Sequence, residues 1–156
     1  MKLFSIFNKD KNINTLKIGA GIYLIEIPKK YLWEYDNEDT LLFYPKGEET
    51  ITMRVTVLSF ERKDGKPSHG SDIVLEDAIS KNFKYEILSE GLVLSEAPPE
   101  QTTEGDTKLI MQFWYLGRDN SLIIFSSTTI LEREDNKAVI DMRRDLPQIF
   151  RSIKTP

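Results

Sequence analysis

The chain has 156 residues, of which 40% are hydrophobic and 29% are charged, with no cysteine and a formal net charge of −4. This length is typical of one domain and buries enough surface for a hydrophobic core without covalent cross-links. The lack of cysteine excludes disulfides, thiolate catalysis and cysteine-based metal sites. The acidic balance argues against a general nucleic-acid binder and provides no electrostatic attraction to an anionic membrane.

The N-terminus begins with a short apolar stretch. Leu3 to Phe7 are mostly apolar, but Asn8 interrupts the stretch before it reaches the roughly 7–15 residues of a signal-peptide core. No later run approaches the ~18 apolar residues that a membrane-spanning helix requires. We therefore expect residues 1–16 to form an N-terminal arm, residues 17–156 to form a single domain, and the protein to be cytoplasmic.

The first half of the chain predicts strands. In residues 50–60, apolar side chains at every second position alternate with Thr52, Arg54 and Thr56. This period of two is typical of a strand with one buried and one solvated face. The remaining segments of this half are expected to form two strands (17–27 and 40–44), an irregular aromatic segment (29–35) and an acidic turn (36–39).

A helix is predicted in the middle of the chain, over residues 72–88. Asp72 can cap its first turn. Apolar residues then recur at helical spacing on one face, at Leu75, Ala78, Ile79 and Phe83. The neighbouring segments are expected to form a polar loop (61–71), a short strand (92–94) and a mobile loop rich in proline and acidic residues (96–106).

The last third of the chain predicts a β-hairpin. Apolar residues alternate through the first strand, which puts Leu109 and Phe113 on the expected core face and Trp114 on the opposite face. Residues 117–120 favour chain reversal, because Gly and Asn tolerate a positive φ. The return strand, 122–131, is apolar on both faces, so we expect it at the centre of a sheet.

An amphipathic helix is predicted at the C-terminus. Glu132, Glu134 and Asp135 crowd its start, where the helix dipole favours negative charge. Apolar residues then recur in steps of three and four from Val139 to Ile153, and this single stripe is expected to cover one side of the sheet. Pro147 is expected to kink or restart the helix.

The order of the predicted elements indicates the fold class. Strands are interrupted once by a helix and end in another helix, without internal repeats and without a regular alternation of strand and helix. We therefore expect an α+β domain with a central antiparallel β-sheet of about six strands, flanked by two or more helices.

The patterns that accompany catalysis or cofactor binding are weak. His69 is the only histidine, and it lies in a polar loop, where a solvated side chain is the simpler interpretation. Residues 19–21 half-match a dinucleotide-binding fingerprint, but a strand pattern follows them where a helix is required. Asp36, Glu38 and Asp39 could offer oxygens to Ca²⁺, although their spacing departs from that of an EF-hand loop. We therefore expect no enzymatic activity, no cofactor and no metal site.

Aromatic side chains next to an acidic turn are the best candidates for contact with a partner. Large aromatic residues at a surface are frequent anchors of protein interfaces. Packing in the core is the default expectation for both tryptophans, and exposure is the alternative. The candidate partner-binding residues are Trp33, Tyr35, Asp36, Glu38, Asp39 and Trp114.

The order of these patterns resembles the PsbP-like superfamily, in particular its small bacterial branch of unknown function. The resemblance extends over residues 17–154 and implies a central antiparallel sheet between helices, in small accessory proteins that act by binding. It rests on the strand Ile25-Glu26-Ile27-Pro28 followed by Trp33, the alternating strand Ile51–Val57, the middle helix, the hairpin at Gly117–Asn120 and the terminal Ile149-Phe150-Arg151-Ser152-Ile153-Lys154.

The function that the sequence favours is a non-enzymatic bacterial binding module. Its expected partner is another protein, and neither nucleic acid nor a membrane is expected. A toxin-immunity protein is an alternative of similar size and acidity. A carboxylate-based hydrolase would require two facing acids in a sheet cleft, and a small-ligand carrier would require an apolar cavity between sheet and helix.

Overall fold

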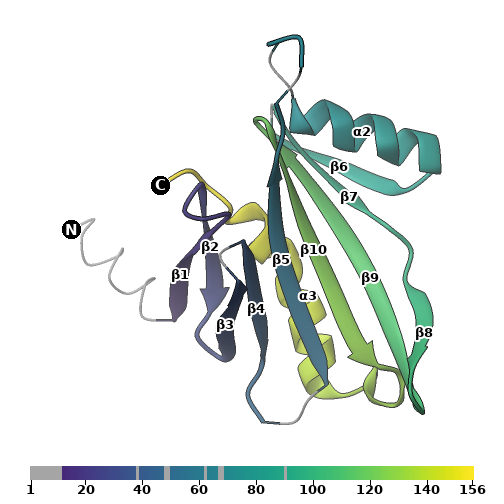
Figure 1. The fold of residues 1–156 in the computed structure, drawn as a ribbon. Helices are drawn as coiled ribbons and strands as arrows, with labels where there is room; N and C mark the ends of the chain where they lie inside the picture. The colour runs from purple at the N-terminus through teal and green to yellow at the C-terminus, as the bar shows by residue number, and fades with distance from the viewer. Residues whose placement is uncertain (1–11, 38, 48–49, 62, 67–68, 90) are drawn as a thin grey trace.

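The computed structural model describes residues 12–37, 39–47, 50–61, 63–66, 69–89 and 91–156. Within these ranges the chain forms one large antiparallel sheet, a two-stranded sheet and two α-helices (Figure 1). The strands are β1 (Ile13–Ile18), β2 (Tyr23–Pro28), β3 (Tyr31–Asn37), β4 (Thr40–Pro45), β5 (Ile51–Ser59), β6 (Lys84–Ser89), β7 (Leu92–Glu96), β8 (Glu100–Glu104), β9 (Thr107–Arg118) and β10 (Ser121–Ile130). The helices are α2 (Gly70–Lys81), the short 3₁₀-helix η1 (Leu131–Arg133) and α3 (Lys137–Arg151).

The large sheet has the strand order β3-β4-β5-β10-β9-β7-β6, and β8 pairs with the first residues of β9. All of its pairings are antiparallel. β9 and β10 form a hairpin whose turn holds Asp119 at a φ of 49°, a conformation that short polar residues tolerate. The predicted α+β class, the hairpin and the central position of the return strand are confirmed.

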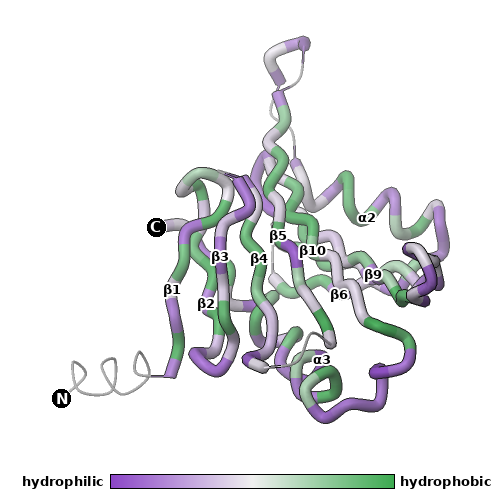
Figure 2. Tube along the Cα trace, turned by 60° about the horizontal axis from the view of Figure 1, so that its bottom comes forward, coloured by the Kyte–Doolittle hydropathy of each residue, from purple (hydrophilic) through white to green (hydrophobic). Residues whose placement is uncertain are grey.

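The hydrophobic core lies between the large sheet and α3. Every second side chain of β10 is buried, and β5 has the same alternation, which Figure 2 shows as changing hydropathy along the strand. α3 packs its predicted apolar stripe against this inner face, with Met142 and Phe150 buried. The rings of Phe125 and Phe150 meet edge to face with centroids 4.6 Å apart. Burial of one face of each element thus orients the helix on the sheet.

The register of β9 corrects the predicted core face of this strand. Trp114 lies opposite Phe125, so its side chain is on the inner face that α3 covers. Leu109 and Phe113 are on the outer face, and Phe113 is only half-buried. Both faces of β9 are apolar, so alternation alone does not tell which of them receives the helix.

The β1–β2 hairpin extends the core beside the C-terminal end of α3. Leu24 and Lys154 exchange two backbone hydrogen bonds of 2.8 and 3.0 Å. The Glu26 N–H donates to the Ser152 hydroxyl at 2.9 Å. Of the predicted arm 1–16, residues 1–11 lie outside the described residues, and residues 13–16 belong to β1.

Helix α2 packs on the outer face of the sheet, over β7 and β9 (Figure 1). Val74 and Ala78 are its buried apolar contacts. The helix is shorter than predicted, because Asn82 adopts a left-handed φ of 56° and donates its N–H to the Ile79 carbonyl. The rest of the segment predicted as helix forms the edge strand β6.

The large sheet contains eight strands, more than the six or so expected. The additional strands are largely exposed: β3 and β6 are edge strands, and every residue of β8 is exposed. Segment 29–35, most of which forms β3, was expected to be irregular, and segment 96–106, which contains β8, was expected to be a mobile loop. Both expectations are wrong, because ladder hydrogen bonds rather than apolar burial hold these strands, and such bonds leave no hydrophobic pattern in the sequence.

The start of α3 is set by a cap. The Asn136 side-chain oxygen accepts a hydrogen bond of 2.9 Å from the Ala138 N–H. The acidic residues expected in the first turn precede the helix instead, in η1 and the turn after it. α3 continues through the exposed Pro147 to Arg151, so the predicted restart does not occur.

Neither of the described α-helices is both long and apolar enough to span a membrane.

Candidate functional site

The outer face of the large sheet is covered unevenly. α2 lies over β7 and β9, and among the described residues most of β5 and β10 carries no helix on this side (Figure 1). α3 covers the inner face of the same strands. The central strands therefore have one buried face and one face that is open to solvent.

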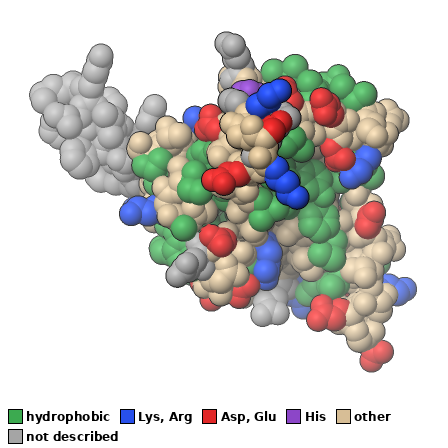
Figure 3. All heavy atoms as spheres, turned by 45° about the horizontal axis from the view of Figure 1, so that its top comes forward, with side chains coloured by type: hydrophobic (Ala, Val, Ile, Leu, Met, Phe, Trp, Pro, Cys, Tyr) green, Lys and Arg blue, Asp and Glu red, His purple; other side chains and the backbone are tan. Residues whose placement is uncertain are grey.

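Apolar side chains gather on this open face. Figure 3 shows them as a strip beside α2. Leu58 is 45% exposed, and the other members are half-buried. The rings of Phe113 and Tyr115 are stacked, with centroids 6.3 Å apart and planes 9° from parallel. We call the following set the outer apolar face: Leu58, Met111, Phe113, Tyr115, Leu122 and Ile124.

Polar side chains border the outer apolar face along the same strands. Thr52 and Arg54 on β5 lie opposite Thr128 and Ser126 on β10. Arg54 forms an ion pair of 3.2 Å with Asp36 on β3. An apolar centre with a polar border is the usual composition of a protein interface.

Trp33 and Tyr35 lie on the edge strand β3, on the same side as the core. Trp33 is 41% exposed, so the default expectation of core packing is wrong for it. Its ring meets that of Tyr35 edge to face, with centroids 5.7 Å apart. The Tyr35 hydroxyl donates to the Lys17 carbonyl at 2.7 Å. These two aromatic residues are available to a partner, and their role as partner contacts stays a prediction.

The acidic residues predicted to contact a partner do not form one cluster in the described part of the chain. Asp36 is paired with Arg54, as described above. The Asp39 N–H donates to the Asn37 side chain at 2.9 Å within the turn. Glu38 lies outside the described residues. In the described part of the chain, no three residues of the metal-ligating types come together.

Trp114 is separated from the β3 aromatics. It is 6% exposed, as the default expectation predicts, and it lies on β9 under α3. Four inter-strand steps separate β3 from β9, which corresponds to roughly 19 Å at about 4.8 Å per step. Trp33 and Trp114 therefore do not belong to one surface.

The structure also places the glycine pair of the half-matched dinucleotide-binding pattern and the single histidine. Residues 19–22 form the tight turn between β1 and β2, and Gly19 and Gly21 have φ values of 61° and 92°. The glycines thus serve a hairpin turn, where positive φ is required. His69 is exposed and directly precedes α2, without a side-chain cap on that helix.

A partly buried cluster of one tyrosine and two charged residues joins α3 to the start of β3. The Tyr31 hydroxyl donates to Asp145 at 2.5 Å, and Lys30 forms an ion pair with the same carboxylate at 2.7 Å. Burial, together with the Asp145 carboxylate, raises the pKa of the Tyr31 hydroxyl well above its ordinary 10.0. Burial also acts to raise the pKa of Asp145, but the hydrogen bonds from Lys30 and Tyr31 outweigh it and hold that pKa below 3.8. This arrangement is suited to holding the fold.

Replacing Asp145 with asparagine is expected to lower the free energy of unfolding near neutral pH by about 1.5–3 kcal/mol, as for other hydrogen bonds to charged groups. The folded-state pKa of Asp145 is lowered, so its contribution is present above the ordinary pKa of 3.8 and is lost as the pH falls through the folded value. Urea unfolding should show a smaller loss of stability on acidification for Asp145→Asn than for the wild type. The control Asp106→Asn, in the exposed turn before β9, should keep the wild-type pH dependence. Equal pH dependence in Asp145→Asn and the wild type would contradict this role.

Sequence reasoning missed the polar residues of a groove beneath α3. Lys84, Glu96 and Arg143 border it, from β6, β7 and α3. A weak signal was present, because Arg143 and Arg151 flank the apolar stripe of α3 at a spacing of two helical turns. The strands carried no comparable signal, because their partners across the sheet are unknown before folding.

Comparison with known proteins finds similar solved structures but no matching family. None of the protein-family models matches the sequence, and none of the curated proteins does. The chain is similar to a protein of Bacteroides thetaiotaomicron VPI-5482 known from a crystal structure, with 14% identity and a TM-score of 0.68 over 93% of this chain. This chain spans about half of that protein, 49% of its length.

A second similar structure is the solution structure of cyanobacterial PsbP (CyanoP) from Synechocystis sp. PCC 6803. It has 10% identity and a TM-score of 0.41, and the match covers 93% of each chain. At 14% identity, the likeness to the Bacteroides protein is one of fold alone.

Proposed function

We propose that this protein is a non-enzymatic binding module that holds an apolar helix of a partner protein on the outer apolar face. The observation that carries the proposal is the partly exposed apolar surface that strands β5, β9 and β10 present beside α2. Contiguous apolar patches of this kind mark interaction sites in proteins that are otherwise well covered.

The backbone pairing of the central strands favours a helix as the occupant. β5, β10 and β9 each have neighbours on both edges, so this face offers side chains but no free row of backbone donors and acceptors. A segment that lies there has to satisfy its own backbone hydrogen bonds, which an α-helix does. α3 covers the other face of the same strands in this manner.

The stacked pair of Phe113 and Tyr115 supports a protein partner. Their rings form a flat, half-buried platform on β9, at the side of the face that borders α2. Aromatic side chains surrounded by a polar border carry a large share of the binding energy in protein interfaces. The alternatives of a toxin-immunity protein and a hydrolase stay predictions from the sequence.

Site-specific photo-crosslinking in the native cell tests this proposal. A benzoylphenylalanine is placed at Leu58, which is 45% exposed on the outer apolar face, or at Ile140, which is 53% exposed on α3. We expect a discrete protein adduct from position 58 only, and mass spectrometry should map it to an apolar segment of the partner. The substitution Phe113→Glu should abolish this adduct, because it buries a charge in the proposed interface.

The possible results distinguish the proteins that could occupy the outer apolar face. Equal adducts from positions 58 and 140, or no adduct from position 58, would contradict the proposal. An adduct with a second copy of this chain would show self-association in place of a different partner protein. Circular dichroism of Phe113→Glu should match the wild type, because a half-buried side chain on an open face is not part of the core between α3 and the sheet.

A further inference from the structure

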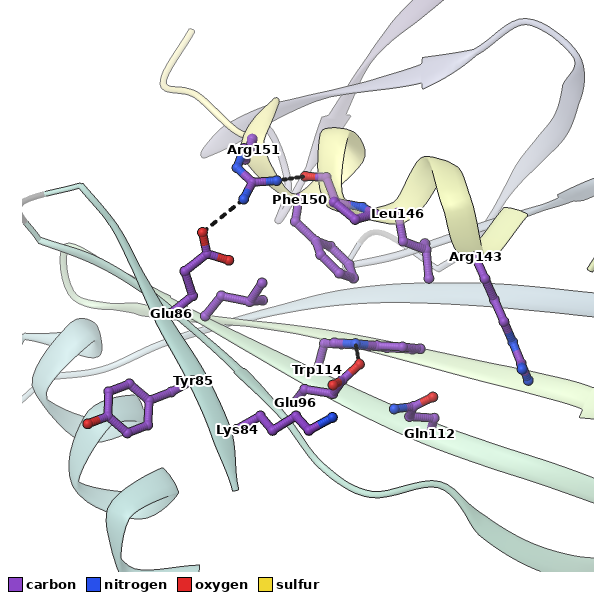
Figure 4. Close-up of a pocket in the computed structure, with 12 residues that line it drawn as sticks. Lys84, Tyr85, Glu86, Glu96, Gln112, Trp114, Arg143, Leu146, Phe150 and Arg151 are labelled. Carbon is purple, nitrogen blue, oxygen red and sulfur yellow. Dashed lines mark hydrogen bonds and ion pairs between the residues drawn. The ribbon is translucent and has the colours of Figure 1, made fainter. Parts of the chain in front are cut away.

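A groove lies between the C-terminal half of α3 and the strands β6, β7 and β9, on the inner side of the sheet (Figure 4). Its volume is about 380 Å³, within the roughly 300–1,000 Å³ of small-molecule sites. The floor is apolar and consists of Leu94, Trp114, Leu146 and Phe150. The groove is thus large enough for a small ligand with an apolar body.

Several polar groups of the groove already have partners. Arg151 on α3 forms an ion pair of 2.9 Å with Glu86 on β6, and it also donates to the Pro147 carbonyl at 3.3 Å. On the floor, the Trp114 indole N–H donates to the Glu96 carboxylate at 3.0 Å. Figure 4 marks these contacts, which close one end of the groove and fix the Glu96 side chain. The charge of Arg151 is therefore matched by that of Glu86.

Two cations of the groove have no hydrogen-bond or ion-pair partner among the described residues. They are Lys84 on β6, which lies opposite Glu96 on β7, and Arg143 on α3. In Figure 4 the Arg143 side chain extends from α3 toward the strands. With Arg151 and Glu86 matched, the remaining charges of the groove lining are those of Lys84, Arg143 and Glu96. The groove therefore has an excess of one positive charge.

We propose that this groove binds a small monocarboxylate with an apolar chain or ring. The apolar body lies against Trp114 and Phe150, and Lys84 and Arg143 bind the carboxylate from the two walls. Glu96 disfavours a dianion, and the two cations disfavour a positively charged ligand. The site is on the opposite face of the sheet from the outer apolar face, so it is independent of the proposed function.

Fluorescence of Trp114 gives a direct test with decanoate as the probe. The chain has two tryptophans, so Trp33→Phe makes Trp114, on the groove floor, the only tryptophan reporter. Decanoate below its micellar concentration is expected to shift the emission of Trp114 in a saturable manner. Decanol, which has the same chain without the charge, is expected to bind at least about tenfold more weakly, because it cannot form a charge-assisted hydrogen bond.

Variants that each remove one positive charge from the groove test where the carboxylate of decanoate binds. Lys84→Gln and Arg143→Gln are each expected to weaken decanoate binding about tenfold while leaving decanol binding unchanged. Lys46→Gln, a matched loss of charge after β4, is expected to have no effect. Phe113→Glu on the outer apolar face should also leave decanoate binding intact, which separates this site from the proposed partner surface. Equal affinity for decanoate and decanol, equal effects of Lys46→Gln and Lys84→Gln, or no change in Trp114 emission would overturn the inference.

Discussion

Phe150→Ala is expected to lower the free energy of unfolding by about 3–5 kcal/mol, the usual range for removing a buried phenylalanine. Phe150 is 3% exposed on α3. Its ring lies between two others, with centroids 4.6 Å from Phe125 and 5.7 Å from Trp114. Truncation therefore removes two aromatic contacts and leaves a cavity between α3 and the centre of the sheet. Equilibrium unfolding in urea measures the loss.

Ile140→Ala is the matched control on the same helix. Ile140 is 53% exposed, so its truncation should change the free energy of unfolding by no more than about 0.5 kcal/mol. If Phe150→Ala cost as little as this control, the packing of α3 on the inner face could not be the main core. The comparison thus tests the orientation of α3 and not only the importance of one residue.

Gly117→Ala is expected to displace α2 and to lower the free energy of unfolding by about 3 kcal/mol, the upper end of the range for overpacking. A β-carbon at position 117 would collide with the Gly70 carbonyl and with the backbone nitrogen of Ser71. A β-carbon at Gly70 would likewise collide with the Ser121 carbonyl. Each collision is between backbones, so a change of rotamer cannot relieve it.

Hydrogen exchange distinguishes this effect from a general loss of stability. In Gly117→Ala, the amides of Val74 and Ala78 on α2 should lose protection before those of α3 do. Gly70→Ala should reproduce this pattern. Thr107→Ala, at the exposed start of β9, should leave α2 unchanged. Uniform loss of protection in α2 and α3 would mean that the two glycines do not specifically position α2.

The most regular elements were predictable from local patterns. The β9–β10 hairpin and the stripe of α3 are encoded by residues close together in the chain, so their period and turn chemistry identify them. The edge strands β3, β6 and β8 were not predicted as strands. Their stability comes from pairing with partners that the sequence does not identify, and their side chains are largely exposed.

The exposure of the aromatic residues depends on their position in the sheet. Trp33 and Trp114 both lie in β-rich segments, yet Trp33 is 41% exposed and Trp114 is 6% exposed. The difference follows from strand order, because β3 is an edge strand and β9 lies beside the central strand under α3. Strand order is a property of the whole sheet, so no local pattern contains it.

The sequence by itself determined the α+β class, the hairpin at the end of the chain and the amphipathic helix that follows it, because these features depend on neighbours in the chain. Only the tertiary structure decided which face of β9 is core, since both faces are apolar and the attachment of α3 selects one of them. It likewise decided that Phe113 and Tyr115 lie on the outer face of β9, which α2 covers only in part. Lys84 and Arg143 are far apart in the sequence, and they border one groove only because α3 packs across the strands.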